Sequence, residues 1–319
     1  MPAPALYRKW RPQLWDEVVG QDHIVQTLRH AIQLDRIAHA YLFAGPRGCG
    51  KTTSARLVAK AVNCLAPDLA RRPCNTCAHC VAVNEGRFLD LIEIDGASNN
   101  SVENVRDLRD KINFAPSQGR YKIYIIDEVH MLSLGAFNAL LKTLEEPPAH
   151  AIFILATTES YKIPATVASR CQRGEFRRIP VADIVARLRA LCDQEGLRVE
   201  PAALELVARQ ATGALRDAIS LLDQLVSADD SVSLAQAQAL LGTAVGQTVQ
   251  DLAAALAAGD QTAGLNLVNA AVDAGTDPRQ LARQMVDYLR ALLLVKHGNA
   301  ALVEATSENR AVMARQVEA

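Results

Sequence analysis

Aromatic side chains and long apolar runs are both scarce in this sequence of 319 residues. Only 4% of the residues are Phe, Trp or Tyr, so we expect hydrophobic cores built from aliphatic side chains and alanine. No stretch reaches the uninterrupted run of about 20 apolar residues that a membrane-spanning helix requires. The N-terminal segment MPAPALYRKW lacks the apolar region of a secretory signal, which predicts a cytoplasmic protein with no membrane partner.

An excess of charge of one sign is also missing. The 34 Lys and Arg residues nearly balance the 35 Asp and Glu residues, which gives a formal net charge of −1. This balance argues against a uniformly basic coat for nucleic acid, while a local basic face stays compatible with it. Because 50% of the residues are hydrophobic and the length exceeds one typical domain, we expect two or three domains with substantial cores.

A complete phosphate-binding loop lies near the start of the chain. Residues 45–52 read GPRGCGKT, which fits the pattern G-x-x-x-x-G-K-T. Glycines let the backbone wrap round an anion, Lys51 supplies a charge for the outer phosphates, and the Thr52 hydroxyl can hold Mg²⁺. A buried strand expected over 40–44 and a helix expected over 53–62 give the loop the required context at a helix N-terminus. The predicted nucleotide-binding residues of the loop are Gly45, Pro46, Arg47, Gly48, Cys49, Gly50, Lys51, Thr52 and Thr53.

Two carboxylates end a second apolar run. Residues 123–126 predict a buried strand, and Asp127 and Glu128 follow it directly. An acid at the carboxyl end of a strand beside a phosphate loop can bind the water shell of Mg²⁺, which suits Asp127. Glu128 can orient the attacking water or accept its proton. Acidic residues also commonly end a strand at solvent, but together with the phosphate loop these two predict a nucleoside triphosphatase.

Apolar runs alternate with helical patterns up to about residue 180, and only helical patterns follow. Alternation at this spacing predicts a parallel sheet covered on both faces, that is, an α/β domain. Three helices are expected in 181–227 and about four in 233–297, whereas the prolines of 1–20 predict an extended segment. Besides the strand before the loop, strands are expected over 89–94, 121–126, 152–156 and 174–178.

Four of the seven cysteines are grouped with the spacing C-x9-C-x2-C-x2-C. Four thiolates form the closed tetrahedral set of a structural Zn²⁺ site, which would hold the insert 64–80 in its fold. An iron–sulfur cluster uses the same ligands and stays an alternative, although nothing else in the sequence suggests redox chemistry. His79, inside a spacer, offers a substitute ligand. The predicted ligands are Cys64, Cys74, Cys77 and Cys80, and we expect Cys49, Cys171 and Cys192 to be ordinary buried or half-buried thiols.

Three further segments, YRKWRP at 7–12, DEVHML at 127–132 and NALLKTLEEPP at 138–148, occur in order with the phosphate loop and the cysteines. In this combination the chain resembles the gamma/tau subunits of bacterial DNA polymerase III, the ATPases of the sliding-clamp loader. The resemblance covers nearly the whole chain and implies the AAA+ fold. The implied domains are an α/β nucleotide domain over 1–179 with a zinc insert at 64–80, a three-helix lid over 180–230, and an all-α collar over 231–319. The chain is expected to stop within this collar or near its end, so the collar can be incomplete.

The resemblance also implies roles for individual residues around the nucleotide. Thr158 matches the sensor of the γ-phosphate, with Thr157 as the neighbour that could take its place. Arg170, in the Ser-Arg-Cys segment, matches the finger that reaches the ATP of an adjacent subunit. The residues alone favour a different interpretation of Arg170, as a surface arginine near a domain edge.

Arg216 and the N-terminal arm complete the implied ATP site. Arg216, in the segment GALRD at 213–217, matches a second phosphate sensor in the lid, whereas the residues alone also fit a salt bridge with Asp217 or Asp223. A segment of the arm matches the lining of the adenine pocket, and simple packing of an extended arm is the plain alternative. The residues of that segment are Tyr7, Arg11, Val18 and Val19.

The implied mechanism is a switch in which binding of ATP with Mg²⁺ lets the assembly hold an open clamp, and DNA-triggered hydrolysis releases it. The implied partners are the delta and delta-prime subunits, further gamma/tau copies, the clamp, and primer-template DNA, at the replisome on the nucleoid. The amides of the turn 96–100, followed by Arg106 and Arg109, are candidate contacts to DNA phosphates. Alternatives are an ATP-inert structural subunit of the loader, a branch-migration helicase or a protein unfoldase. The intact phosphate loop disfavours the first, and the polar turn at 96–100, without an aromatic, disfavours the last.

Overall fold

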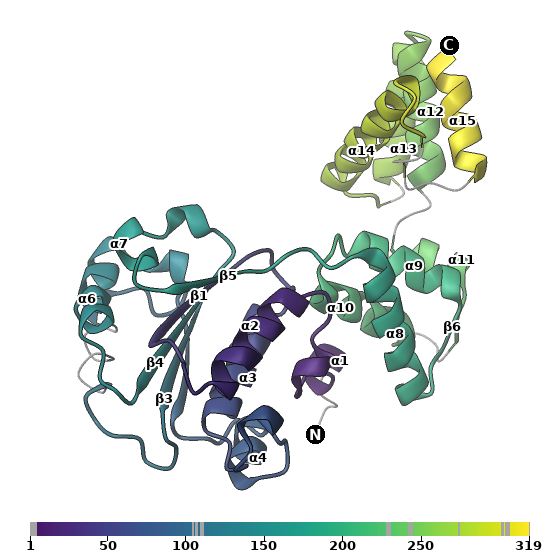
Figure 1. Ribbon diagram of the computed structural model, residues 1–319. Helices are drawn as coiled ribbons and strands as arrows, with labels where there is room; N and C mark the ends of the chain where they lie inside the picture. The colour runs from purple at the N-terminus through teal and green to yellow at the C-terminus, as the bar shows by residue number, and fades with distance from the viewer. Residues whose placement is uncertain are drawn as a thin grey trace. The chain divides into compact units, whose positions relative to one another are not determined.

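The computed structural model describes residues 5–318 apart from 104, 106–107, 109–111, 228–230, 242–244, 274, 301–302 and 304–306. The chain divides into two compact units, Met1–Val232 and Ser233–Ala319. Figure 1 labels the elements of both units. No helix in the described ranges combines the length and the apolar character needed to cross a bilayer.

A five-stranded parallel sheet is the centre of the first unit, which confirms the predicted α/β architecture. The strand order is β2-β3-β4-β1-β5, with every neighbouring pair parallel. β1 and β4 are buried along their whole length because they lie inside the sheet and under helices. The strands are β1 (Ala40–Ala44), β2 (Leu91–Asp95), β3 (Lys122–Asp127), β4 (Ala151–Thr157) and β5 (Gln172–Glu175).

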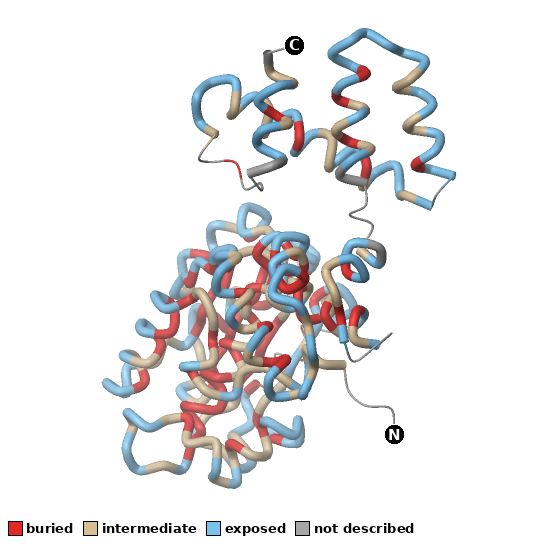
Figure 2. The backbone as a smooth tube through the Cα atoms, turned by 90° about the vertical axis from the view of Figure 1, so that its right-hand side faces the viewer, coloured by how far each residue is buried: buried red, intermediate tan, exposed pale blue. Residues whose placement is uncertain are grey.

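Alternating side chains of the strands serve two separate cores. Ile123 and Ile125 of β3 face a core formed with α2 and α3, whereas Tyr124 and Ile126 face a core formed with α6. Figure 2 shows the buried positions of this unit, in red, concentrated between these layers. The helices on the two faces are α2 (Asp22–Gln33), α3 (Lys51–Val62) and α6 (Leu134–Glu145), and the short ones are η2 (Leu69–Arg71), α4 (Ala78–Asn84), η3 (Val129–Met131), η4 (Ser160–Lys162) and α7 (Ala165–Ala168).

The expectation of an extended N-terminal segment was wrong in part. A single helical turn, α1 (Leu6–Lys9), and a 3₁₀ turn, η1 (Trp15–Glu17), lie between the prolines. Contacts distant in sequence stabilise α1: the Leu6 amide donates to Asp223 Oδ2 at 3.2 Å, and the Trp10 indole donates to Glu195. Such contacts compensate for the weak tendency of a four-residue segment to form a helix, and no local sequence signal reports them.

Three helices complete the first unit, as the sequence predicts. They are α8 (Val181–Glu195), α9 (Pro201–Gln210) and α10 (Leu215–Val226), with a short parallel pair, β6 (Arg198–Val199) and β7 (Ser231–Val232). α8 ends at Gly196, whose φ of 71° provides the left-handed residue that commonly ends a helix. The buried side chains between these helices are aliphatic, as the scarcity of aromatic residues predicts, and include Leu188, Leu191, Leu204 and Leu222.

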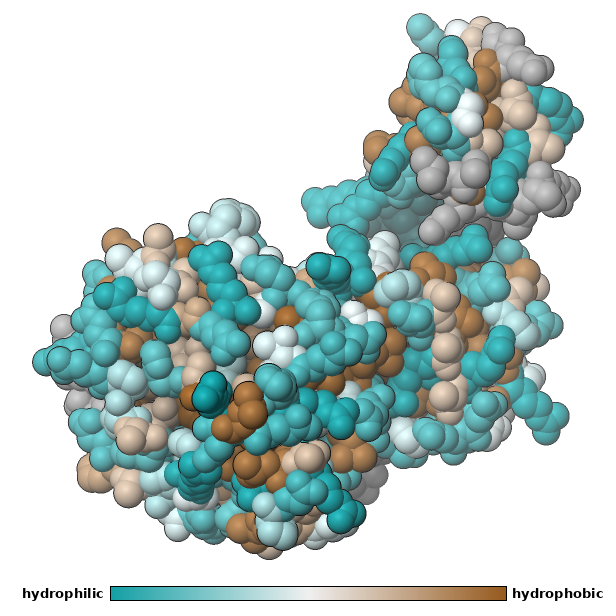
Figure 3. Space-filling model, in the orientation of Figure 1, coloured by the Kyte–Doolittle hydropathy of each residue, from teal (hydrophilic) through white to brown (hydrophobic). Residues whose placement is uncertain are grey.

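The second unit is a bundle of helices around a small core of Val249, Leu281, Tyr288 and Met313. Several apolar side chains of the bundle remain exposed, and Figure 3 shows brown, hydrophobic residues on its visible face. Among them are Leu256, Leu265 and Leu293, with exposed fractions of 61%, 66% and 58%. The helices are α11 (Leu234–Leu240), α12 (Val245–Ala257), α13 (Gln261–Asp273), α14 (Pro278–Lys296) and α15 (Ser307–Glu318), of which α15 was not predicted because its sequence has few apolar residues.

Candidate functional site

The phosphate-binding loop joins β1 to α3 and is closely packed on two sides. Gly45 has a φ of 147°, and a Cβ there would lie only 2.4 Å from the Phe176 carbonyl oxygen. Gly48 has a φ of 75°, and its Cβ would lie 2.9 Å from the Cβ of Ala214 at the start of α10. These positions require glycine for their backbone angles and for the close approach of neighbouring segments. The loop is therefore fixed between the end of β5 and the three-helix segment.

Lys51 and Thr52 are the first residues of α3 and follow the glycines of the loop directly. Lys51 is 6% exposed, and its Nζ donates to the carbonyls of Gly45 and Pro46 at 2.8 Å each. Burial lowers the pKa of Lys51, while the charges of Glu128 and Asp127 act in the opposite direction. Thr52 Oγ1 donates to Asp127 Oδ2 at 2.8 Å, so the structure brings together the two residues predicted to hold Mg²⁺. A hydroxyl and a carboxylate are hard oxygen ligands that fit this ion.

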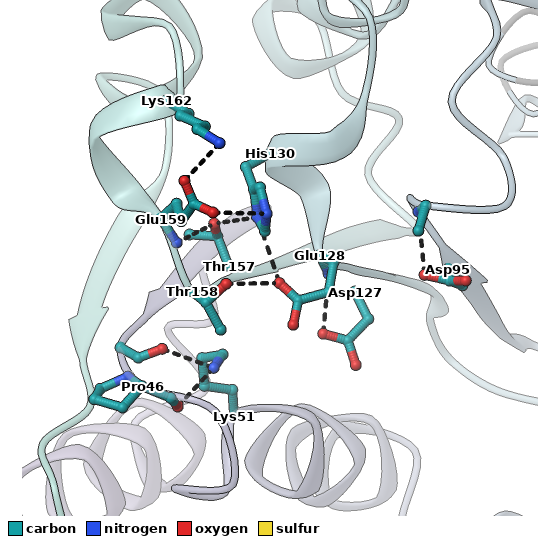
Figure 4. A network of polar contacts seen from close by, with 12 residues as sticks. Pro46, Lys51, Asp95, Asp127, Glu128, His130, Thr157, Thr158, Glu159 and Lys162 are labelled. Carbon is teal, nitrogen blue, oxygen red and sulfur yellow. Dashed lines mark hydrogen bonds and ion pairs between the residues drawn. The ribbon is translucent and has the colours of Figure 1, made fainter. Parts of the chain in front are cut away.

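Glu128 follows β3 in a left-handed conformation, with φ 46° and ψ 45°. Its Oε2 accepts a hydrogen bond of 3.1 Å from the hydroxyl of Thr158, the residue after β4 (Figure 4). The hydroxyl of Thr157 instead lies 2.9 Å from Nδ1 of His130. Of the two candidate threonines, Thr158 therefore contacts the predicted catalytic carboxylate.

Gly96 belongs to this region, although the sequence analysis did not recognise its part in the site. Its amide donates to the Asp127 carbonyl at 2.8 Å, and a Cβ would lie 2.8 Å from the Glu128 carbonyl oxygen. The glycine directly after β2 was the available signal. Gly96 thus allows the turn after β2 to pass close to the backbone of the two carboxylates.

Several donors in the rest of this turn, which the sequence suggests for DNA phosphates, are bonded within the turn itself. The carboxylate of Asp95 accepts hydrogen bonds from the Ala97 amide at 3.1 Å and the Ser98 hydroxyl at 2.6 Å. The Asn99 amide donates to the Asp95 carbonyl at 3.0 Å. A neighbouring acid therefore already binds several donors of the turn, and its contact to DNA phosphates stays a prediction. The other candidates, Arg106 and Arg109, lie outside the described residues.

One pocket connects the phosphate loop with the N-terminal arm and α10. The arm residues predicted to contact adenine all line it, and the guanidinium of Arg216 lies 4.7 Å from the centre of the Tyr7 ring. The Arg216 amide donates to the Gly48 carbonyl at 3.4 Å, so α10 begins directly on the loop. Among the described residues Arg216 forms no ion pair with Asp217 or Asp223. The residues that line the pocket include Tyr7, Arg11, Val18, Val19, Arg47, Gly48, Cys49, Gly50, Lys51, Thr52, Thr53, Asp127, Glu128, Ile179, Leu215, Arg216 and Ile219.

Arg170 does not line this pocket, and neither do the predicted residues Thr158, Gly45 and Pro46. Arg170 follows α7, and its Nη2 lies 2.5 Å from Glu145 Oε1. Its Nη1 donates to the Thr166 carbonyl at 2.5 Å. The side chain is 32% exposed and therefore accessible from outside the chain.

The four grouped cysteines converge, as their spacing predicts. Their sulfur atoms all lie within 4.8 Å of one another, and the Cys64–Cys77 and Cys74–Cys80 pairs are each 4.0 Å apart. A tetrahedral ion with Zn–S bonds of about 2.3 Å requires sulfurs about 3.8 Å apart. The cluster therefore has the size for one ion, whereas an iron–sulfur cluster must place its ligands around several metal atoms.

Backbone amides around the cluster point at the sulfur atoms. The amides of Cys74, Cys77 and Cys80 each donate at 3.4 Å to the sulfur of another cysteine of the group. Although burial opposes ionisation, donors from Thr76 and Cys77 lower the pKa of Cys74 to about 6. Hydrogen bonds of this kind favour the thiolate, which is the form that binds metal.

His79 is not a member of the cluster, despite its position in a spacer. Its Nδ1 lies 2.7 Å from the Asn63 carbonyl, and its ring packs on Phe88 with 5.2 Å between ring centres. The buried Lys60 of α3 lies beside the cluster instead. Its Nζ donates to the side-chain oxygens of Asn75 and Asn84 at 2.7 and 2.8 Å. The burial of Lys60 could not be predicted from its sequence position, because lysine in a helix is ordinarily exposed.

Three family models match consecutive stretches of the chain. A model of the DNA polymerase III delta subunit matches residues 20–180, and one of the DNA polymerase III clamp-loader ATPase lid domain matches 183–229. A model of domain III of the gamma and tau subunits matches 232–318. This chain belongs to the gamma/tau family of DNA polymerase III clamp-loader subunits. As a family member it is an AAA+ subunit, in agreement with the parallel sheet and the loop.

Two curated members of the gamma/tau family illustrate the similarity. The tau subunit of Bacillus subtilis is 51% identical over 92% of this chain, and that of Escherichia coli is 45% identical over 93%. The chain spans about half the length of these relatives, 52% and 46% respectively. Among solved structures, the Thermotoga maritima RuvB Holliday junction branch migration motor has a similar fold. It is 21% identical, with a TM-score of 0.54 over 73% of this chain and 72% of its own.

Proposed function

We propose that this chain is an ATP-hydrolysing subunit of a clamp loader, which couples ATP binding and hydrolysis to loading of the sliding clamp on primed DNA. The observation that carries the proposal is the convergence of three segments on one pocket. The loop with Lys51, the strand end with Asp127 and Glu128, and the arm with Tyr7 all line it. An ATP-inert subunit does not need a Thr52 hydroxyl bonded to Asp127, nor a Glu128 carboxylate that accepts a hydrogen bond from Thr158.

In this proposal the pocket residues divide the work of phosphoryl transfer. Lys51 leaves the loop carbonyls to bind the outer phosphates, and Thr52 and Asp127 hold Mg²⁺, which neutralises phosphate charge when bound. Glu128 takes the proton of the water that attacks the γ-phosphorus, while Thr158 holds Glu128 and senses that phosphate. When ATP binds, the guanidinium of Arg216 moves from the Tyr7 ring to a phosphate of the nucleotide. The arm residues Tyr7, Arg11, Val18 and Val19 surround the adenine.

Two features support assembly with other subunits. Arg170 is accessible and lies outside its own chain's pocket, as an arginine that acts on a neighbour's ATP must be. The helical unit exposes leucines that an oligomer would bury. The proposed partners are the delta and delta-prime subunits, further gamma/tau copies, the clamp, and the backbone of primer-template DNA. In the cysteine cluster we assign a structural Zn²⁺, because the closed set of four thiolates leaves no position for substrate.

A clamp-dependent ATPase assay tests this function. The chain, assembled with its companion subunits, is expected to hydrolyse ATP faster when clamp and primed DNA are both present. Stimulation by unfolded protein or by four-way DNA junctions, with none by clamp and primed DNA, would instead support another AAA+ motor. A Glu128→Gln variant controls for contaminating ATPases, since it leaves the pocket's shape nearly unchanged.

A further inference from the structure

His130 lies behind Glu128, where β3 and β4 end side by side. Its side chain is 6% exposed, and Nδ1 lies 2.9 Å from Thr157 Oγ1 and 3.4 Å from Glu128 Oε2. On the opposite edge of the ring, Nε2 lies 3.6 Å from Glu159 Oε1. Figure 4 shows the imidazole between the two carboxylates. One ring therefore connects the residue after β3 with two residues at the end of β4.

The far side of this contact is itself fixed. Glu159 Oε2 lies 2.6 Å from Lys162 Nζ and accepts a hydrogen bond of 2.6 Å from the Tyr161 hydroxyl. The Glu159 amide donates to Thr157 Oγ1 at 2.9 Å. Glu159 and Thr157 thus form an anchored pair against which the imidazole is held. His130 cannot turn away from Glu128 without breaking contacts on its other side.

These contacts involve only one carboxylate oxygen of Glu128. Oε2 meets both the imidazole and the Thr158 hydroxyl, whereas Oε1 has no hydrogen bond among the described residues. The left-handed backbone at Glu128 is unfavourable for a residue with a side chain, so the surrounding contacts must stabilise it. A general base benefits from this arrangement, because the held oxygen sets the direction of the free one.

We propose that His130 is a positioning residue for ATP hydrolysis: it holds Glu128 Oε2 so that Oε1 faces the attacking water. The inference rests on the proposed ATPase function and adds to it a residue that acts only through Glu128. His130 does not line the nucleotide pocket. It therefore contributes to the rate of proton transfer and not to the affinity for nucleotide.

The test compares His130→Ala and His130→Asn with the wild-type chain, each assembled with its companion subunits, clamp and primed DNA. His130→Ala is expected to lower kcat about tenfold to a hundredfold, while the Kd for ATP changes less than about twofold. His130→Asn, whose amide nitrogen can take the place of Nδ1, should recover part of the loss. His150→Ala is the matched control, because the His150 ring also makes a hydrogen bond, of 3.0 Å to the Ile112 carbonyl, but among the described residues it does not contact Glu128.

A double variant separates positioning from a purely structural role. Once Glu128→Gln has removed the base, adding His130→Ala should lower the residual turnover no further. Three results would each overturn the inference. The first is an equal loss of kcat on adding His130→Ala to the wild type and to Glu128→Gln, and the second is an unchanged kcat in His130→Ala. The third is a loss of kcat in His130→Ala that is accompanied by equal losses of ATP affinity and thermal stability. If Glu128→Gln abolishes turnover while both His130 variants keep full kcat, only the inference fails. If the wild-type assembly does not hydrolyse ATP, the proposed function fails first.

Discussion

The nucleotide pocket and the cysteine cluster lie at the two ends of one helix, yet they are built in opposite ways. α3 begins with Lys51 in the pocket and ends just before Cys64 of the cluster. In the pocket, the charged groups of Lys51 and Arg216 rest on loop carbonyls and on an aromatic ring. In the cluster, the sulfurs already face one another and receive backbone amides. In the proposed function the pocket must switch, and its charged groups rest on contacts that a ligand can replace, whereas the proposed structural metal site is preassembled.

The largest expected effect comes from breaking the pocket. Lys51→Ala should abolish measurable ATP binding, because the outer phosphates lose their buried cation. Glu128→Gln should keep ATP bound but lower turnover by about 10²–10⁴-fold, since it removes the base alone. Equilibrium binding and steady-state hydrolysis distinguish the two. Lys142→Ala, which removes an exposed lysine of α6, is the control and should change neither quantity.

Removing a cysteine of the cluster should change the metal content and the stability of the protein. Cys77→Ser is expected to release the metal and to lower the free energy of unfolding by at least about 3 kcal/mol, because metal binding is coupled to the fold of the insert. Metal analysis and thermal unfolding measure these changes. Cys171→Ser changes a thiol outside the cluster and should leave the metal content intact. Full metal content in Cys77→Ser would contradict the assigned ligand set.

Lys60 sharpens the comparison because it lies near the end of α3, the helix that joins the two sites, and beside the cluster. Lys60→Met should lower the free energy of unfolding by about 1.5–3 kcal/mol, since the charged Nζ loses its hydrogen bonds to the side-chain oxygens of Asn75 and Asn84. Chemical denaturation measures the loss, and Lys142→Met makes the same change at an exposed position. We expect metal retention to weaken in Lys60→Met while ATP affinity stays nearly constant. The reverse pattern would show that Lys60 serves the pocket.

The smallest effect is expected at a carboxylate that belongs to neither site. Asp90 accepts hydrogen bonds of 2.7 Å from the amides of Ser117, Gln118 and Gly119. Burial opposes ionisation, but these amides lower the pKa of Asp90 below its usual value. A lowered folded-state pKa contributes stability above the unfolded value of about 4, and this contribution is lost as the pH falls through the folded value.

Asp90→Asn should therefore cost about 1–2 kcal/mol at pH 7, because the amide can satisfy fewer of these donors. Unfolding measured at pH 7 and at pH values below 4 should show a smaller difference between wild type and variant at the lower pH. A difference that stays constant with pH would show that the charge of Asp90 does not stabilise the loop.

Features encoded in short segments were predictable from the sequence, and those that depend on distant contacts were not. The phosphate loop, the strand ending in Asp127 and the cysteine spacing are local patterns, and the structure brings each to its expected neighbours. The turn of α1 depends on Asp223, more than two hundred residues away. His130 becomes meaningful only when β3 and β4 lie side by side, and the burial of Lys60 follows only from the folded insert.

The most direct test of the account is nucleotide binding and turnover by one preparation. The wild-type chain, assembled with its companion subunits, clamp and primed DNA, should bind ATP with Mg²⁺ and hydrolyse it, with binding lost in Lys51→Ala and only turnover lost in Glu128→Gln. Turnover that survives in both variants, or a wild-type assembly that neither binds nor hydrolyses ATP, would contradict the claim that this pocket cleaves a nucleoside triphosphate.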